Sequence, residues 1–253
     1  MQKTRRFLNT PVLLALMTFG VAISSLPGYA SNDKAESLAP IEAPITSTLE
    51  AISTDIVSSP FDAASWNDIE VGRLDRQVLS LALTSAERAL GDSVGEAETL
   101  TVIDFSKPST SARMWIYDLR ARKLLFEEHV SHGRNSGHNL ATSFSNEAGS
   151  FKSSIGLYRA AEAYYGKHGY SLRLDGLERG FNDRARERAI VIHGAEYVNA
   201  KTAKAQGRLG RSLGCPAVRP EIAREVIDAV KDGGLIFAYY PDPEWLETST
   251  FLN

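Results

Sequence analysis

The chain has 253 residues with 28 basic and 31 acidic side chains, which gives a formal net charge of −3. This length suffices for one ordinary domain with a sizeable core, or for two small domains. Proteins that bind nucleic acid concentrate basic residues against phosphate, so the mildly acidic balance argues against a nucleic-acid partner. The single cysteine excludes a disulfide within the chain. The fold must therefore rest on its hydrophobic core.

The N-terminus predicts a signal peptide over residues 1–30. Three basic residues in the first six positions precede an uncharged apolar stretch over 11–26, and Gly28 and Ala30 suit the positions that a signal peptidase reads. The stretch is short for a membrane span, although an uncleaved anchor remains the alternative. We therefore expect an exported protein, periplasmic in a Gram-negative cell envelope and not stably inserted in the membrane after cleavage. Removing residues 1–30 leaves 25 basic and 31 acidic residues, a net charge of −6.

The next segment, residues 31–65, is rich in Ser, Ala, Thr and Pro and has few large apolar side chains. This composition is typical of a flexible spacer, or of a disordered leader with no task of its own. From residue 69 to residue 90 the apolar side chains recur at helical spacing, which predicts a helix packed on the domain. We assign residues 66–253 to one domain that includes this helix.

Short β-rich segments then dominate the chain and predict a mainly β fold, a sandwich or barrel with peripheral helices. Residues 131–154 form a long irregular connection, and loops of that length in a compact domain are often functional. A second helix is expected over 220–231, because Pro220 suits its first turn and Gly233 and Gly234 suit its end. Strands are expected over 100–105, 113–119, 123–130, 155–159, 170–174, 188–193 and 235–240.

The only cysteine, Cys215, lies between Gly214 and Pro216, which favour a turn. Arg211 and Arg219 flank it, and cationic neighbours lower the pKa of a thiol by favouring the nucleophilic thiolate. The alternative is that Cys215 is a small buried apolar side chain. An exported protein exposes a free thiol to oxidation, and this favours a cysteine with a function.

A candidate general base, His193, ends the β-rich run 188–193. A strand end holds an imidazole rigidly, and an imidazole can take the proton of a thiol near neutral pH. The alternative is a half-buried histidine with a structural role. Gly214 allows a tight turn that directs the N–H groups of Cys215 and its neighbours to one point, as an oxyanion site requires.

Together these residues resemble a known family. Ile192-His193-Gly194 followed by Ser212-Leu213-Gly214-Cys215 is similar to the catalytic signature of the L,D-transpeptidases with the YkuD-like fold. The closer resemblance is to the murein L,D-transpeptidase catalytic domain branch, with its Gly-Arg-Ser-x-Gly-Cys-Pro-Ala motif. The resemblance runs from about residue 75 to residue 241, and further blocks that carry it are 102–106, 132–137, 144–146, 171–177 and 180–182.

The resemblance implies a mechanism in which Cys215 is the nucleophile, His193 is the base and the carbonyl of Gly194 orients the imidazole. The implied substrate is a peptidoglycan stem tetrapeptide, which loses its terminal D-Ala to form a thioester with the enzyme. An amine of a second stem would then give a 3→3 cross-link, whereas water would make the protein an L,D-carboxypeptidase. A non-catalytic peptidoglycan-binding protein on the same fold is a further alternative. The resemblance implies no cofactor and no metal, and the sequence does not predict the oligomeric state.

Four further residues are candidates for binding the substrate. Arg211 and Arg219 could hold its carboxylates by paired hydrogen bonds, or they could be solvated surface charges. Ser212 and Tyr158 complete the set, with packing as the alternative for Tyr158. A sortase-like transpeptidase, with Arg219 as third catalytic residue, is a rival, but the sequence around Cys215 does not resemble that family.

Two departures from the wider family are evident. Leu213 stands where the family usually has a histidine, so the base must come from elsewhere, and His193 is the candidate. The separation of His193 and Cys215, 22 residues, is longer than usual, which predicts that residues 197–207 lengthen a loop over the site. His132 and His138 could suggest a metal pair, but no third ligand has a regular spacing.

Overall fold

The computed structural model describes residues 59–91 and 96–253, which belong to one compact unit. The predicted signal peptide, 1–30, and most of the predicted spacer lie outside the described residues. Within the described residues, no helix is both long enough and apolar enough to cross a membrane.

The last residues of the predicted spacer, 59–65, are part of the folded domain. They lead into a short 3₁₀ helix, η1 (Ala63–Trp66), in which Trp66 is 1% exposed. The indole Nε1 of Trp66 donates a hydrogen bond to the carbonyl oxygen of Pro60 at 2.7 Å, and Phe61 packs against the same apolar cluster. Burial of these aromatic side chains fixes the segment on the domain.

Eight strands form one mixed sheet with the order β3-β2-β1-β8-β4-β5-β6-β7. The pairs β1/β8 and β6/β7 are parallel, and the other neighbours are antiparallel. The mainly β fold predicted from the sequence is therefore confirmed. The strands are β1 (Thr99–Asp104), β2 (Met114–Asp118), β3 (Lys123–Glu128), β4 (Gly156–Gly166), β5 (Gly169–Gly176), β6 (Val191–Gly194), β7 (Ala217–Val218) and β8 (Leu235–Tyr239).

The two edges of this sheet nearly meet, because the chain that follows β3 runs beside the chain that leads into β7. Ser131 N donates to the carbonyl oxygen of Ala217 at 2.9 Å, and Ser212 N donates to that of His132 at 2.9 Å. Gly133 and Ser212 form a parallel bridge. We call this contact between residues 131–134 and 212–217 the seam. It converts the sheet into a nearly closed barrel.

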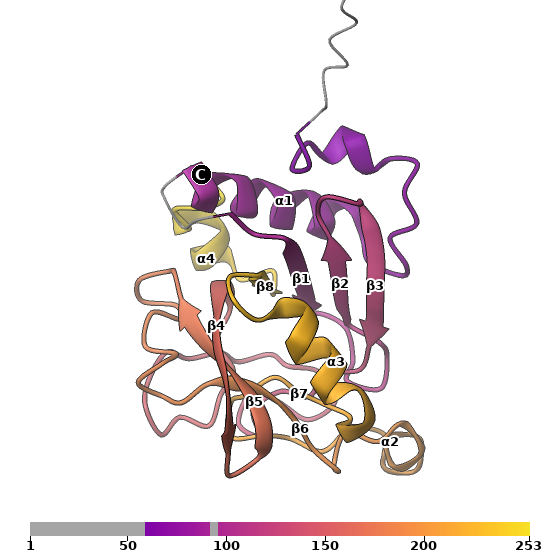
Figure 1. Cartoon of the computed structure of the whole chain (residues 1–253). Helices are drawn as coiled ribbons and strands as arrows, with labels where there is room; N and C mark the ends of the chain where they lie inside the picture. Colours follow the sequence, from indigo (N-terminus) through magenta and orange to yellow (C-terminus); the bar gives the residue numbers. More distant parts are fainter. Residues whose placement is uncertain (1–58, 92–95) are drawn as a thin grey trace, which may run out of the picture. The chain divides into compact units, whose positions relative to one another are not determined.

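Two apolar clusters stabilise the sheet on its two faces. Along β1, Leu100 and Val102 belong to one cluster and Ile103 to the other, as the period of two in a strand requires. Helix α1 (Arg76–Gly91) packs on β1 and β8, while α3 (Pro220–Val230) packs chiefly on β6 (Figure 1). The sheet is thus buried on both faces where these helices cover it.

The N-terminal helix is shorter than predicted, because it begins at Arg76 and not at residue 69. The side chain of Asp75 accepts hydrogen bonds from the backbone N–H groups of Gln77 (2.8 Å) and Val78 (3.3 Å). These bonds satisfy N–H groups that a helix start leaves without partners, so Asp75 caps the helix. The apolar residues before it pack without being helical.

Other boundaries differ because local periodicity does not report turns and caps. The strand predicted over 155–159 extends to Gly166, and the strand predicted over 188–193 begins only at Val191. Two short helices that the sequence did not predict are α2 (Ala200–Gln206), capped by the side chain of Asn199, and α4 (Pro243–Thr248), capped by that of Asp242. The two-residue strand β7 is too short to give a periodic signal.

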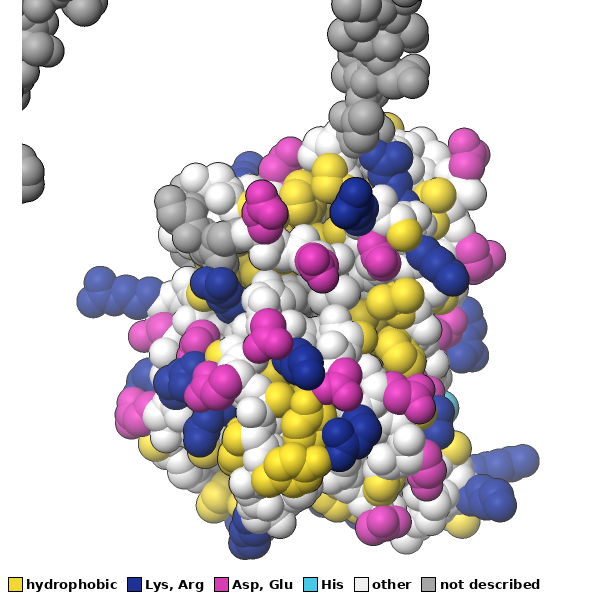
Figure 2. Space-filling view, viewed as in Figure 1, with side chains coloured by type: hydrophobic (Ala, Val, Ile, Leu, Met, Phe, Trp, Pro, Cys, Tyr) yellow, Lys and Arg dark blue, Asp and Glu magenta, His cyan; other side chains and the backbone are white. Residues whose placement is uncertain are grey.

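The surface mixes charges of both signs. On the face shown in Figure 2, Lys and Arg side chains alternate with Asp and Glu side chains, and apolar side chains lie between them. This face therefore presents no extended region of a single charge.

Candidate active site

Residues 210–216 form the turn that leads into β7 and carries the candidate nucleophile. Gly214 has a φ of +130°, and a Cβ at this position would lie 2.9 Å from the carbonyl oxygen of Lys152. The hydroxyl of Ser212 accepts a hydrogen bond from Gly214 N at 3.0 Å and donates one to the carbonyl oxygen of Cys215 at 2.6 Å. The turn therefore needs glycine at 214 and is closed by the serine hydroxyl.

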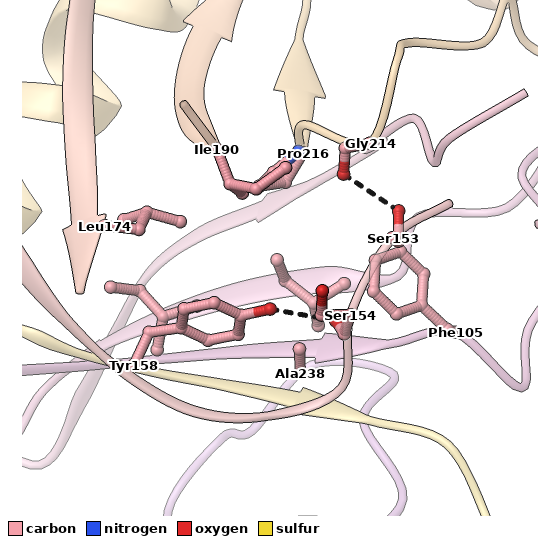
Figure 3. A pocket seen from close by; sticks show the side chains of 11 residues that line it. Phe105, Ser153, Ser154, Tyr158, Leu174, Ile190, Gly214, Pro216 and Ala238 are labelled. Carbon is pink, nitrogen blue, oxygen red and sulfur yellow. Dashed lines mark hydrogen bonds between the residues drawn. The ribbon is translucent and has the colours of Figure 1, made fainter. Parts of the chain in front are cut away.

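The long connection 131–154 contacts this turn through hydrogen bonds. Ser153 Oγ donates to the carbonyl oxygen of Gly214 at 3.0 Å and accepts from Gly133 N at 3.0 Å. Figure 3 shows the serine hydroxyl directed at the Gly214 carbonyl. The loop that the sequence marks as functional thus holds the cysteine turn in place.

The thiol of Cys215 is half-buried. Its Sγ lies 3.6 Å from the carbonyl oxygen of Ala189, to which it donates a hydrogen bond. Burial raises the pKa of the Cys215 thiol, while the N–H of Val191 and the positive charge of Arg188 partly offset this effect. In this conformation the thiol is the protonated, hydrogen-bonded form.

The cation that acts on the Cys215 thiol is Arg188, and not Arg211 or Arg219 as expected from the sequence. Arg211 donates from Nη1 to the carbonyl oxygen of Gly137 at 2.8 Å, which holds it against the connecting loop. Arg219 donates from Nε and Nη2 to the two carboxylate oxygens of Glu128, at 3.2 and 2.7 Å. These paired donors are the ones that a substrate carboxylate would need, so in this conformation Arg219 is engaged with the protein itself.

His193 lies in β6 and is 2% exposed. In the sheet it pairs with Ala217 of β7, and Ala217 is two residues after Cys215. Its Nδ1 lies 2.9 Å from the carbonyl oxygen of Gly194, and its ring stacks on that of His168 with 4.4 Å between the centroids. If Nδ1 donates to this carbonyl, Nε2 keeps a lone pair that can accept a proton.

The protonation of His193 also suits a base. Burial lowers the pKa of its imidazole, and the hydrogen bond to Gly194 only partly offsets this effect. The ring is therefore neutral at neutral pH. No hydrogen bond in the described part of the chain joins this ring to Cys215, because the thiol is bonded to Ala189. Proton transfer to His193 would require the thiol to leave its hydrogen bond to Ala189.

Two of the expected substrate-binding side chains have structural roles. Tyr158 is 3% exposed, and its hydroxyl donates to the carbonyl oxygen of Ser154 at 3.0 Å (Figure 3). It lines a small cavity that Gly214 also lines, and so little of its side chain is exposed that it does not face an open groove. Ser212 is 5% exposed, with its hydroxyl used in the turn. Substrate binding by either side chain would therefore need a rearrangement, and this expectation does not fit the observed geometry.

Sequence reasoning missed two side chains that interact electrostatically with the thiol. One is Arg188, the first residue of the predicted strand that ends at the candidate base. The other is Tyr197, whose phenol has its pKa raised to about 12, mainly by burial and also by Cys215. Tyr197 covers Gly210, where any Cβ would collide with it. The sequence signal for Tyr197 was its position at the start of the lengthened loop, 197–207, that was predicted to lie over the site.

The two histidines considered as a metal pair have other partners. His132 is fully buried, and its Nδ1 lies 2.7 Å from Nη2 of Arg113. Burial and this guanidinium lower the pKa of His132 to about 4. His138 accepts a hydrogen bond at Nε2 from Nε of Arg208 at 3.2 Å. Within residues 59–91 and 96–253, no group of three His, Cys, Asp or Glu side chains is arranged to hold a metal ion.

Residues 70–239 match the model of the L,D-transpeptidase catalytic domain family. This match covers more than half of the chain, and the chain therefore belongs to that family. The resemblance stated from the sequence is confirmed at the level of the family, whereas the particular branch is not tested. Among curated proteins, none matches this chain significantly.

Solved structures of L,D-transpeptidases are also similar to this chain at low identity. They include an L,D-transpeptidase from Mycobacterium smegmatis (16% identity, 57% of this chain, 59% of that chain, TM-score 0.37). Another is L,D-transpeptidase 3 from Mycobacterium tuberculosis (14% identity, 56% of this chain, 61% of that chain, TM-score 0.34). A third is an L,D-transpeptidase from Stackebrandtia nassauensis (12% identity, 73% and 90%, TM-score 0.35). The chain thus covers 59% of the length of the first of these.

Proposed function

We propose that this protein is a cysteine-dependent L,D-transpeptidase that acts on peptidoglycan stem tetrapeptides. The observation that carries the proposal is the pairing of His193 in β6 with Ala217 in β7, two residues after Cys215, in a domain of the L,D-transpeptidase family. A thiol beside a rigidly held neutral imidazole is the arrangement that acyl transfer to cysteine requires.

The first half-reaction forms a thioester. The Cys215 thiol rotates away from Ala189 and gives its proton to Nε2 of His193, and the thiolate attacks the carbonyl between the diamino acid and the terminal D-Ala. The tetrahedral oxyanion collapses, the C–N bond breaks, and the imidazolium returns the proton to the amine of the departing D-Ala. His193 is held for this exchange by its hydrogen bond to Gly194.

The second half-reaction transfers the acyl group. An amine of a second stem peptide attacks the thioester carbonyl while His193 takes its proton, and the thiolate leaves and is reprotonated. The product is a 3→3 cross-link. Because Gly214 N is bonded to Ser212, the N–H of Cys215 itself is the candidate oxyanion donor in both half-reactions.

The deciding experiment is incubation of the purified protein with a disaccharide-tetrapeptide, followed by mass spectrometry of the products. Cross-linked dimers with loss of D-Ala support the proposal. Trimmed tripeptides without dimers would make the protein an L,D-carboxypeptidase, and an unchanged substrate would favour a non-catalytic peptidoglycan-binding protein. A carbapenem should add one adduct to the intact mass, and the adduct should be absent in Cys215→Ala.

We also propose that the chain is exported and acts in the periplasm. The support is the basic, apolar and small-residue pattern of residues 1–30. Expression of the full chain in a Gram-negative host, with N-terminal sequencing of the protein from the periplasmic fraction, tests this proposal. A mature N-terminus at Ser31 is expected, and full-length protein confined to the cytoplasm would contradict it.

A further inference from the structure

Arg188 lies between the connecting loop and the cysteine turn, and its guanidinium is held by backbone and hydroxyl oxygens. Nη1 donates to the carbonyl oxygen of Ser145 at 2.7 Å and to Ser154 Oγ at shorter range. Nη2 donates to the carbonyl oxygen of Lys152 at 2.7 Å and makes a longer contact, 3.4 Å, with Ser150 Oγ. With these donors committed to the protein, the guanidinium is fixed in position.

The fixed guanidinium lies beside the cysteine turn. Nη2 is 3.5 Å from the position that a Cβ would occupy on Gly214, the residue before the thiol. The next residue along the chain, Ala189, supplies the carbonyl oxygen that accepts the hydrogen bond of Cys215. Arg188 thus approaches the cysteine both through its side chain and through the backbone of its neighbour.

The charge of Arg188 is not cancelled by a carboxylate. No ion pair among the described residues includes Arg188, whereas Arg219 is paired with Glu128. All four of its partners are neutral oxygens, and the side chain is half-buried, so water screens it only in part. A partly buried, unpaired charge acts over several ångströms because the local dielectric is low.

We propose that Arg188 is a positioning residue that favours the thiolate of Cys215 through its fixed positive charge. Arg188 has the role that the sequence suggested for Arg211 and Arg219, which is to favour the thiolate by a nearby positive charge. A second titratable group near the thiol is Tyr197, whose own ionisation is opposed by a negative charge on Cys215. The imidazole of His193 lies in β6, opposite Ala217, and is uncharged at neutral pH. Burial raises the thiol pKa, and Arg188 limits this rise. The inference rests on the proposed function only in taking Cys215 as the nucleophile.

The test is the pH dependence of iodoacetamide alkylation of Cys215, which needs no peptidoglycan substrate. In Arg188→Met the midpoint should rise by about one pH unit, so that alkylation below the midpoint is about tenfold slower. Arg188→Lys, which keeps the charge, should remain closer to the unsubstituted protein. Because the readout is independent of cross-linking, failure of this inference can be distinguished from failure of the proposed function.

Two controls separate charge from structural support. Arg184→Met removes a surface arginine of the same segment, paired with Glu187, and should leave the midpoint unchanged. Ser154→Ala removes a hydrogen-bond partner of the guanidinium without changing the charge of the protein. It should lower the thermal stability and leave the alkylation midpoint nearly unchanged. A folded Arg188→Met protein with an unchanged midpoint would overturn the inference. Should that variant not fold, the neutral Arg188→Gln, which keeps an amide donor for Lys152 O, takes its place: a raised midpoint supports the inference and an unchanged midpoint overturns it. A rise of the alkylation midpoint in Ser154→Ala as large as that in the neutral Arg188 variant would overturn the inference.

Discussion

Sγ of Cys215 and the carbonyl oxygen of Ala189 lie 3.6 Å apart, in a hydrogen bond donated by the thiol. Ala189 has a φ of 53°, in the left-handed region that costs a residue with a side chain roughly 1–2 kcal/mol. This backbone geometry aims the carbonyl at the thiol, so the S–H is bonded to Ala189 and not to His193. The observed conformation is therefore that of a resting thiol, which must rotate before proton transfer.

The first prediction follows from the buried thiol. Burial raises the pKa of Cys215 in the folded protein above its value in the unfolded chain. Alkylation without substrate should therefore reach its midpoint at higher pH in the native protein than in urea. Because the pKa of Cys215 is higher in the folded state than in the unfolded state, the thiol stabilises the fold fully at pH values below its unfolded pKa. This contribution is lost as the pH rises through the folded pKa. A lower midpoint in the native protein would contradict the observed geometry.

The second prediction concerns the turn before the nucleophile. In Gly214→Ala the new Cβ would lie 2.9 Å from Lys152 O and 3.0 Å from Ile190 Cδ1, at a φ of +130°. We expect a loss of stability on the order of 1–3 kcal/mol and a marked loss of acylation by a carbapenem. Gly180→Ala is the matched control, because Gly180 has a φ of +87° but open space around it. It should cost less stability and leave acylation intact, as thermal unfolding and adduct formation would show.

The third prediction concerns the buried histidine of the seam. His132 has its pKa lowered to about 4, so the unfolded chain binds a proton that the folded chain does not. Stability is then complete above the unfolded pKa and falls with decreasing pH, by about 2 kcal/mol between pH 7 and pH 5.

His132→Asn removes the titrating group and keeps an acceptor for Arg113. The comparison uses the change in the free energy of unfolding between the two pH values, and not its absolute value, because the substitution itself changes stability. Urea unfolding at both pH values should show a smaller loss in the variant than in the unsubstituted protein. Equal losses in the two proteins would contradict the assignment.

The fourth prediction concerns the residue beside the nucleophile. Leu213 is 58% exposed, so Leu213→His should change stability by no more than about 0.5 kcal/mol. His193→Gln should slow acylation by about 10²-fold or more if His193 is the base. The double variant tests whether a histidine at 213 can replace that base. We expect no rescue in single-turnover acylation, and recovery would place the base in the turn.

The sequence predicted much of the fold because alternation and turn residues are local signals. The strands over 100–105, 113–119 and 235–240 lie within one or two residues of β1, β2 and β8. The early start predicted for the first helix, at residue 69, had a physical cause: apolar spacing reports burial, whereas the helix start depends on the cap at Asp75.

The candidate site shows the same division. By itself the sequence determined that the only thiol lies in a glycine turn, that a histidine ends a strand, and that both belong to a family motif. Only the tertiary structure decided which charges surround the thiol. Arg211 and Arg219 are neighbours of Cys215 in sequence, but Arg211 bonds to the connecting loop and Arg219 to Glu128 of β3, whereas Arg188 arrives from a separate segment. The reason is that hydrogen-bond partners and burial set the electrostatics of a group, and both depend on the closure of the barrel along its seam.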